Sequence, residues 1–277
     1  MLGNWIRVLS DEGSLEDLSL VNANVEEFDL TLSATGHVYV GQYFPFNNFY
    51  VEVSTASTGA ATLDVEYWEG SQWRDAVDLL DGTKLSGATL GRTGVIQFSP
   101  DLHHSWPMVP STSDTSSIPE LSTVTIYDLY WMRFSPSDDI AATIKRISYA
   151  FCTNQHLRDL DPEVDNFLEI WGGSTKTNWN DQIVLASQHV VATLKSGGLI
   201  KDRANILRFD DIYLATAYKT LAIIFSRLGS NYVDKAGKYQ LDFESLMSGE
   251  RYSAFDQNND ANPSAAERNE IQSKGIR

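Results

Sequence analysis

Five oxygen-bearing side chains near the end of the sequence have the spacing of a calcium-binding loop. The stretch DQNNDANPSAAE aligns with an EF-hand loop. Its ligand positions hold Asp256, Asn258, Asp260, Asn262 and Glu267. The position that needs glycine for a sharp turn is Ala261, and the position whose N–H pairs with a neighbouring loop is Pro263, which has none. A calcium site, a vestigial loop and a plain polar tail stay open, and no metal ion or other cofactor is predicted.

Tryptophan side chains offer a second chemistry, because exposed aromatic rings on a sheet can stack on sugars. Trp68, Trp73 and Trp131 lie in or beside segments with a strand-like pattern. Side chains alternate along a strand, so Tyr67 and Trp68 must lie on opposite faces, as must Tyr130 and Trp131. At least one member of each pair therefore belongs to a core. We favour a role in the core or at an interface, and keep sugar binding by the three tryptophans as the alternative.

The other candidate motifs do not assemble into an active site. GGSTKTNW, residues 172–179, lacks the Gly-Lys-Ser/Thr ending of a phosphate loop and follows no strand. His103 and His104 are adjacent and have no zinc-type partners at a suitable spacing. Cys152 is expected to be a small buried residue. No Gly-x-Ser-x-Gly elbow is present, so no catalytic residues are predicted and nothing in the sequence supports an enzyme.

Composition narrows the classes of protein that fit. The 277 residues are 42% hydrophobic, which is enough for one large domain or two modest ones. A net charge of −16 repels nucleic-acid phosphates, so sequence-specific nucleic-acid binding is not expected. A single cysteine excludes an internal disulfide. The apolar run 212–225 is too short for a bilayer and contains Lys219, so we expect a soluble protein made in a reducing cytoplasm, without a membrane partner.

The first 155 residues show the pattern of an antiparallel β-sandwich. Short runs rich in β-branched and aromatic residues are separated by Gly, Asn and Ser, as in strands joined by turns. Apolar and polar positions alternate over 62–68, a turn is predicted over Glu69–Gln72, and Trp73 begins the return strand. The Ser/Thr/Pro-rich segment 109–123 is expected to form a long surface loop inside this domain.

After Phe151 the apolar spacing becomes that of helices. Helices are predicted over 161–171, 180–196, 210–228 and 233–248. Asp161 and Pro162 are taken as the N-cap and first residue of the first helix. The predicted fold class is therefore α+β: an N-terminal antiparallel β-sandwich, a small C-terminal helical bundle and an extended polar tail. The predicted domains are 1–155, 156–248 and 249–277.

The predicted helix 210–228 is apolar nearly all round. Its main apolar stripe leaves Ile212, Ile223 and Ile224 on other faces. A helical region this small has few partners for such a helix in its own chain, so either the β domain or other copies must cover it. We favour other copies, and predict an oligomer interface at Ile212, Tyr213, Ile223 and Ile224.

Two stretches resemble structural proteins of tailed bacteriophages. VEYWEGSQW, followed later by YWMRF, is similar to a β-sandwich of phage structural proteins. LASQHVVATLKSGGLIKDRANILRFDDIYLATAYKTLAIIFSRL, residues 185–228, resembles the helical core of phage head-to-tail connector (adaptor, or head-completion) proteins. The β domain is a departure, because minimal members of that family are mainly helical.

The resemblance implies a virion structural protein of the phage neck. Such a protein forms a ring, taken as a dodecamer, between the portal protein and a downstream neck or tail-completion protein, and viral DNA passes through the ring. Assembly would take place in the host cytoplasm. The polar tail suits an arm that orders on a neighbouring subunit. The alternative is a carbohydrate- or receptor-binding β-sandwich module of a virion or a cell surface.

Overall fold

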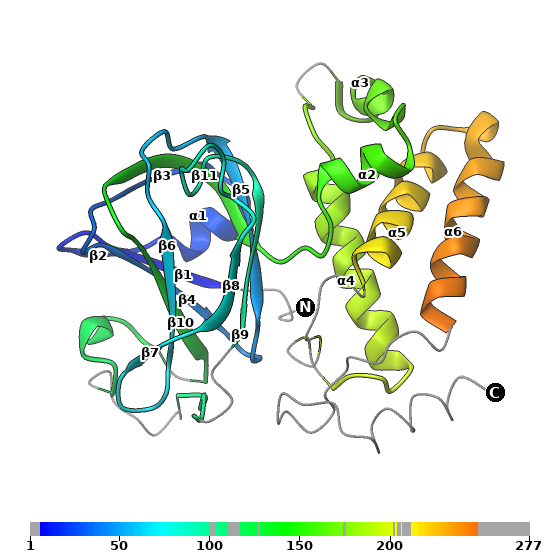
Figure 1. Ribbon diagram of the computed structural model, residues 1–277. Helices are drawn as coiled ribbons and strands as arrows, with labels where there is room; N and C mark the ends of the chain where they lie inside the picture. The colour runs from blue at the N-terminus through cyan, green and yellow to red at the C-terminus, as the bar shows by residue number, and fades with distance from the viewer. Residues whose placement is uncertain are drawn as a thin grey trace. The chain divides into compact units, whose positions relative to one another are not determined.

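The structure is a computed structural model, and it describes residues 6–99, 104–109, 117–126, 128–173, 176–201, 203, 206 and 212–248. Antiparallel sheets come first and helices follow, which confirms the predicted α+β class (Figure 1). The chain divides into two compact units, Met1–Tyr149 and Ala150–Arg277. The predicted tail, 249–277, lies outside the described residues.

The first unit contains two antiparallel sheets. One sheet has six strands in the order β2-β1-β4-β10-β6-β7, and the other has five in the order β3-β11-β5-β9-β8. The strands are β1 (Arg7–Asp11), β2 (Leu15–Asp17), β3 (Phe28–Leu32), β4 (His37–Gln42), β5 (Asn48–Thr55), β6 (Leu63–Trp68), β7 (Trp73–Asp75), β8 (Val77–Asp81), β9 (Gly94–Ser99), β10 (Tyr130–Pro136) and β11 (Ile140–Ser148). A short helix, α1 (Ser19–Asn24), lies between β2 and β3 in the sequence.

The predicted aromatic hairpin is confirmed. β6 pairs with β7, and Trp68 lies directly opposite Trp73. The Glu69 N–H donates to the Gln72 carbonyl at 3.1 Å, and Gly70 has a φ of 107°, a conformation that favours glycine. The period-2 alternation is also observed, because Leu63, Val65 and Tyr67 are buried in the core shared by the two sheets.

A segment between β9 and β10 folds back over the outer face of the six-stranded sheet. We call its described residues (104–109, 117–126, 128 and 129) the cap. The cap contains a one-turn 3₁₀ helix, Pro119–Leu121, and its Ile118, Leu121 and Ile126 are fully buried. They form a second core with Tyr39, Trp68 and Trp131 of the sheet. The prediction of a surface loop over 109–123 is therefore wrong for this part, since apolar residues within it cover the sheet.

The second unit is helical. Its helices are α2 (Asn154–Leu160), α3 (Leu168–Gly172), α4 (Asn180–Ser196), α5 (Tyr213–Ser226) and α6 (Val233–Ser248), with 3₁₀ turns at Val164–Phe167 and Ser230–Tyr232. The predicted helix 161–171 is observed in part, as the 3₁₀ turn Val164–Phe167 followed by α3, so its predicted start at Asp161 is wrong. Helix α2 has no counterpart among the predicted helices; it begins after Thr153, whose N–H donates to His156 Nδ1 at 3.2 Å. Asp161 instead ends this helix. The predicted ends of α4 and α6 agree with the structure.

Helix α5 is covered within its own unit. It packs against α2, α4 and α6, which surround it in Figure 1. Ala217, Leu221 and Phe225 are fully buried along it. The sequence argument that this helix lacks partners in its own chain is therefore wrong, because three helices together bury most of its circumference.

A glycine in β4 makes room for a buried indole. A Cβ atom at Gly41 would lie 3.0 Å from the Trp131 ring and 3.1 Å from Leu129. We expect Gly41→Ala to lower the free energy of unfolding by about 1–3 kcal/mol, since the indole must shift in a packed core. Gly237→Ala is the matched control, because nothing lies within 4 Å of that Cβ in α6. It should raise stability by about 0.5–1 kcal/mol, as measured by chemical denaturation.

Candidate functional site

The three tryptophans of the predicted sugar-binding surface lie together on the outer face of the six-stranded sheet, beneath the cap. Trp68 is 3% exposed and Trp131 is fully buried. The Trp131 indole N–H donates to the Ile126 carbonyl of the cap at 2.9 Å. Trp73 packs edge-on against Trp68 at 5.3 Å and is the one of the three that is partly exposed. The alternative of an exposed sugar-binding surface is therefore wrong for Trp68 and Trp131. Both belong to an aromatic core that the cap covers.

An ion-pair network lies beside these rings. Arg133 of β10 lies between Tyr39 of β4 and Glu66 of β6 in the strand register. Its guanidinium donates twice to Glu66, at 2.6 and 3.1 Å, and stacks 4.7 Å above the Trp73 ring. Burial raises the pKa of Tyr39 to about 12, so its phenol stays protonated near neutral pH. Arg133 also lies 3.5 Å from Glu120 of the cap, so the network joins strands of the sheet to the cap.

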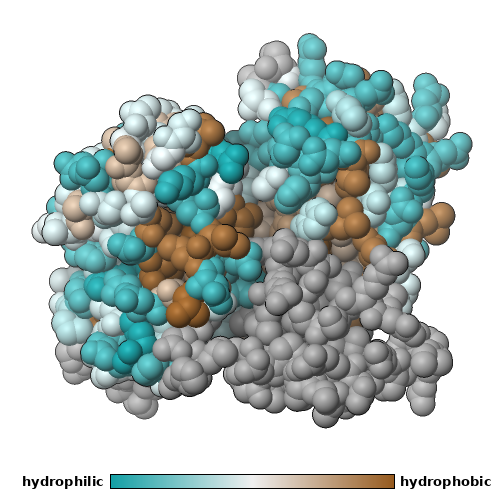
Figure 2. Space-filling view, in the orientation of Figure 1, coloured by the Kyte–Doolittle hydropathy of each residue, from teal (hydrophilic) through white to brown (hydrophobic). Residues whose placement is uncertain are grey.

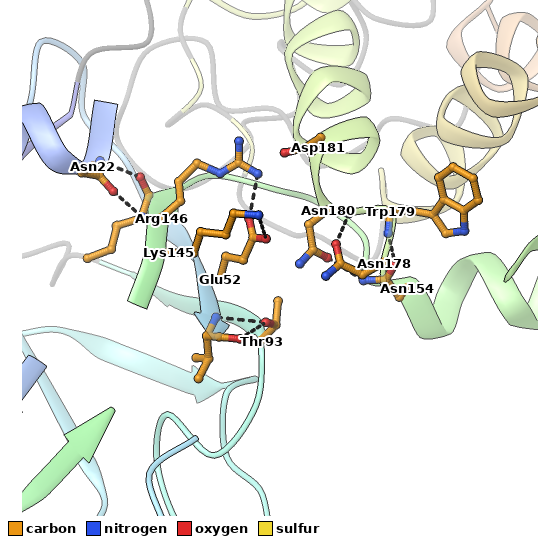
Figure 3. A network of polar contacts seen from close by, with 12 residues as sticks. Asn22, Glu52, Thr93, Lys145, Arg146, Asn154, Asn178, Trp179, Asn180 and Asp181 are labelled. Carbon is orange, nitrogen blue, oxygen red and sulfur yellow. Dashed lines mark hydrogen bonds and ion pairs between the residues drawn. The ribbon is translucent and has the colours of Figure 1, made fainter. Parts of the chain in front are cut away.

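The five-stranded sheet carries a second polar network (Figure 3). Glu52 of β5 is 3% exposed and accepts from Arg146 of β11 at 2.9 Å, with Lys145 at 3.7 Å. Nearby, the Asn22 amide of α1 bonds to both the N–H and the carbonyl of Ile147. These contacts fix α1 and β5 to β11, and they explain how a buried carboxylate is tolerated in a sheet.

In the helical unit, asparagine side chains fix the start of α4 (Figure 3). Asn154 donates to Asn180 at 2.6 Å and accepts the Trp179 N–H at 2.8 Å. The Asn178 side chain accepts the Asn180 N–H at 3.1 Å. The motif 172–179, whose residues 174 and 175 are not described, thus leads into a helix held by side chains. In the sequence it links α3 to α4.

Asp161 forms the main polar contact between α2 and α6. It is 4% exposed, and its carboxylate lies 2.6 Å from Lys235 Nζ and accepts the Tyr239 hydroxyl at 3.0 Å. The Lys235 ammonium also lies 4.3 Å above the Phe225 ring of α5. Burial and the Asp161 charge raise the pKa of Tyr239. This contact joins three helices and is structural, because each charged group faces a partner.

The predicted oligomer-interface residues do not form one exposed surface. Ile212 and Ile224 are fully buried in their own chain, and Tyr213 and Ile223 are only partly exposed. The prediction is corrected for the two buried isoleucines, since α5 is enclosed by its neighbours. Exposed apolar residues of the helical unit lie elsewhere, at Ile170, Leu185, Val233 and Leu241.

Cys152 is buried, as predicted. Burial raises the pKa of its thiol to about 12, and Thr220 Oγ1 lies 3.9 Å from the sulfur. A thiolate is needed for reaction with a disulfide reagent. We therefore expect no measurable reaction of the native chain with Ellman's reagent at neutral pH, and one reactive thiol after denaturation. Rapid reaction of the native chain would contradict this burial.

The candidate calcium ligands near the end of the sequence lie outside the residues that the structure describes. They are Asp256, Asn258, Asp260, Asn262 and Glu267. His103 also lies outside the described residues. Among the residues that the structure describes, no three His, Cys, Asp or Glu side chains are grouped so that they could hold a metal ion. No described helix combines the length and the apolar character needed to cross a membrane.

Comparisons of the chain with protein-family models, with curated proteins and with solved structures found no match. The function therefore has to be inferred from the residues themselves. The ion pairs of Arg133 with Glu66, Arg146 with Glu52 and Lys235 with Asp161 join elements of the fold.

Proposed function

We propose that the chain is a structural protein of a phage neck, which forms a ring between the portal protein and a downstream neck or tail-completion protein. The observation that carries this proposal is the compact helical unit around α5. Helices α4 and α5 and the link between them make up the stretch 185–228, whose sequence resembles the helical core of phage adaptors. A separate β-sandwich precedes this unit, which suits a bracing or decorating role.

Charge supports the passage of DNA through such a ring. The net charge of −16 gives a surface that repels phosphates and lets a duplex slide without sticking. The ion pairs that join strands and helices support the same function, because a neck protein must be rigid. The dodecamer and its portal partner come from the family resemblance.

The subunit contacts of this ring are assigned to the outer face of α6. Val233, Gly237 and Leu241 are spaced four residues apart and lie on one side of the helix. Val233 and Leu241 are 61% and 67% exposed. The opposite side of α6 carries Tyr239 and Phe243, which are buried. A ring requires two different surfaces to meet, so this face would pack on another part of the next subunit.

Native mass spectrometry with and without the portal protein of the same virion tests the proposal. We expect a portal-dependent ring for the full chain, and a loss of assembly for the double substitution Val233→Glu and Leu241→Glu. Deleting residues 249–277 should leave a folded chain that assembles poorly, because the arm is proposed to contact a neighbour. A full chain that stays monomeric with portal would contradict the proposal.

A further inference from the structure

A histidine fills the acceptor position of the capping box that begins α2. Thr153 is the N-cap, and its N–H donates to Nδ1 of His156, three residues on, at 3.2 Å. Capping boxes ordinarily place Glu or Gln at this position, whose oxygens still accept at neutral and mildly acidic pH. An imidazole nitrogen accepts a hydrogen bond only while it is unprotonated. The cap of α2 therefore depends on the protonation state of His156.

The turn that this cap holds also carries the link to α4. Asn154 follows the N-cap as the first residue of α2. Its side chain accepts the Trp179 N–H at 2.8 Å and donates to the Asn180 side chain at 2.6 Å (Figure 3). Trp179 is fully buried and Asn180 is 1% exposed. Both contacts need the Asn154 backbone to stay in the first turn of α2, so fraying of that turn frees the start of α4 as well.

The charged side chains around α2 already have other partners. Arg158 pairs with Asp165 of the following 3₁₀ turn at 2.7 Å, and Asp159 accepts from a side-chain amide of its own helix at 2.8 Å. Helix α5 presents the Tyr213 ring, whose centroid lies 4.8 Å from that of the His156 imidazole. An aromatic ring tolerates an imidazolium beside it. A proton on His156 is therefore expected to act through the lost acceptor of the capping box.

Solvent protons have access to His156. The residue is partly exposed. The described surface of the helical unit is also largely hydrophilic in the view of Figure 2. Histidine side chains ordinarily take up a proton between about pH 7 and about pH 5.5. The cap is therefore expected to be present at neutral pH and to be lost as the pH falls through this range.

We propose that the start of α2 is an acid-sensitive joint. Protonation of His156 at Nδ1 breaks its hydrogen bond to the Thr153 N–H, frays the first turn of α2 and releases the Asn154 contacts that hold α4. The Arg158–Asp165 ion pair lies beyond this turn and persists, so the joint opens without unfolding the helical unit. This inference uses only contacts within the second unit and does not depend on ring formation.

Amide hydrogen exchange of the full chain, followed residue by residue by NMR at about pH 7.5 and about pH 5.5, tests the proposal. The exchange rates are corrected for their intrinsic pH dependence. Protection of the Thr153 and Trp179 N–H groups should then fall roughly fivefold on acidification, the factor that loss of a helix cap typically produces. His156→Gln should keep this protection at both pH values, because the glutamine oxygen accepts in place of Nδ1. His156→Ala should lower it at both.

His189→Gln is the matched control, because it removes a histidine of α4 that lies outside the capping box. It should leave the acid response of Thr153 and Trp179 unchanged. The proposal is overturned if the unmodified chain keeps its protection at both pH values. It is also overturned if His156→Gln responds to acid as the unmodified chain does, since another group is then the sensor. Equal loss in His156→Gln and His156→Ala at neutral pH would assign the role to ring packing on Tyr213, again against the proposal.

Discussion

Replacing Trp131 with alanine is expected to destabilise the β-sandwich unit by about 3–5 kcal/mol. The indole is fully buried between β4, β10 and the cap, and its N–H donates to the Ile126 carbonyl. Its removal leaves a cavity under the cap and an unpaired carbonyl, and both costs add to the lost apolar contact. Gly41 lies against this ring and has no side chain that could fill the space.

Hydrogen exchange measured peptide by peptide can check this expectation in the full chain, since it separates the two units. Opening of β4 and β10 should become more frequent by roughly two to three orders of magnitude. The exchange of α4 and α5 should not change. Trp73→Ala is the matched control: that ring is partly exposed, so its effect should be about 1–2 kcal/mol. If Trp131→Ala and Trp73→Ala had equal effects, the cap would not exclude water from the outer face of the six-stranded sheet.

The second large effect is expected at Asp161. Asp161→Asn should destabilise the helical unit by about 2–3 kcal/mol, because it leaves Lys235 without its carboxylate partner. The estimate is below the value for a fully buried pair, since Lys235 is 34% exposed. The substitution also weakens the charged acceptor of the Tyr239 hydroxyl.

Chemical denaturation followed by helical circular dichroism measures this effect, and Glu163→Gln serves as the control. Glu163 is exposed and lies two positions along the chain, so its loss should cost no more than about 0.5 kcal/mol. A further comparison is Tyr239→Phe, which removes only the hydroxyl and should cost about 1 kcal/mol. If Asp161→Asn were as mild as Glu163→Gln, the contact between α2 and α6 would not stabilise the unit.

Local patterns in the sequence predicted much of the fold. The hairpin at Glu69–Gln72 follows from alternation on both sides of a Gly-containing turn, and the end of α4 follows from paired glycines. Asp161 followed by Pro162 is a strong helix-start pattern, so the sequence predicts a helix from Asp161 and not α2, which ends there. Nothing local reveals that the same carboxylate is needed by Tyr239, which lies far along the chain.

Contacts between distant segments explain the other differences. Alternation placed Tyr67 and Trp68 on opposite faces correctly, but it could not show that a cap buries the second face as well. For the same reason, spacing could not predict that α2, α4 and α6 pack around α5 or that Arg133 pairs with Glu66. In β11, a register shift lets both Ile144 and Ile147 enter the core, against simple alternation.

The central claim, that this chain forms a ring on a portal, is tested most directly by electron-microscopic imaging of the full chain mixed with that portal protein. The account predicts a ring of additional density on one face of the portal, which disappears with the Val233→Glu and Leu241→Glu double substitution. The ring should persist with Leu80→Ser, the matched control, which removes an equally exposed leucine from β8 of the first unit. Portal particles that look the same with and without the full chain would contradict it.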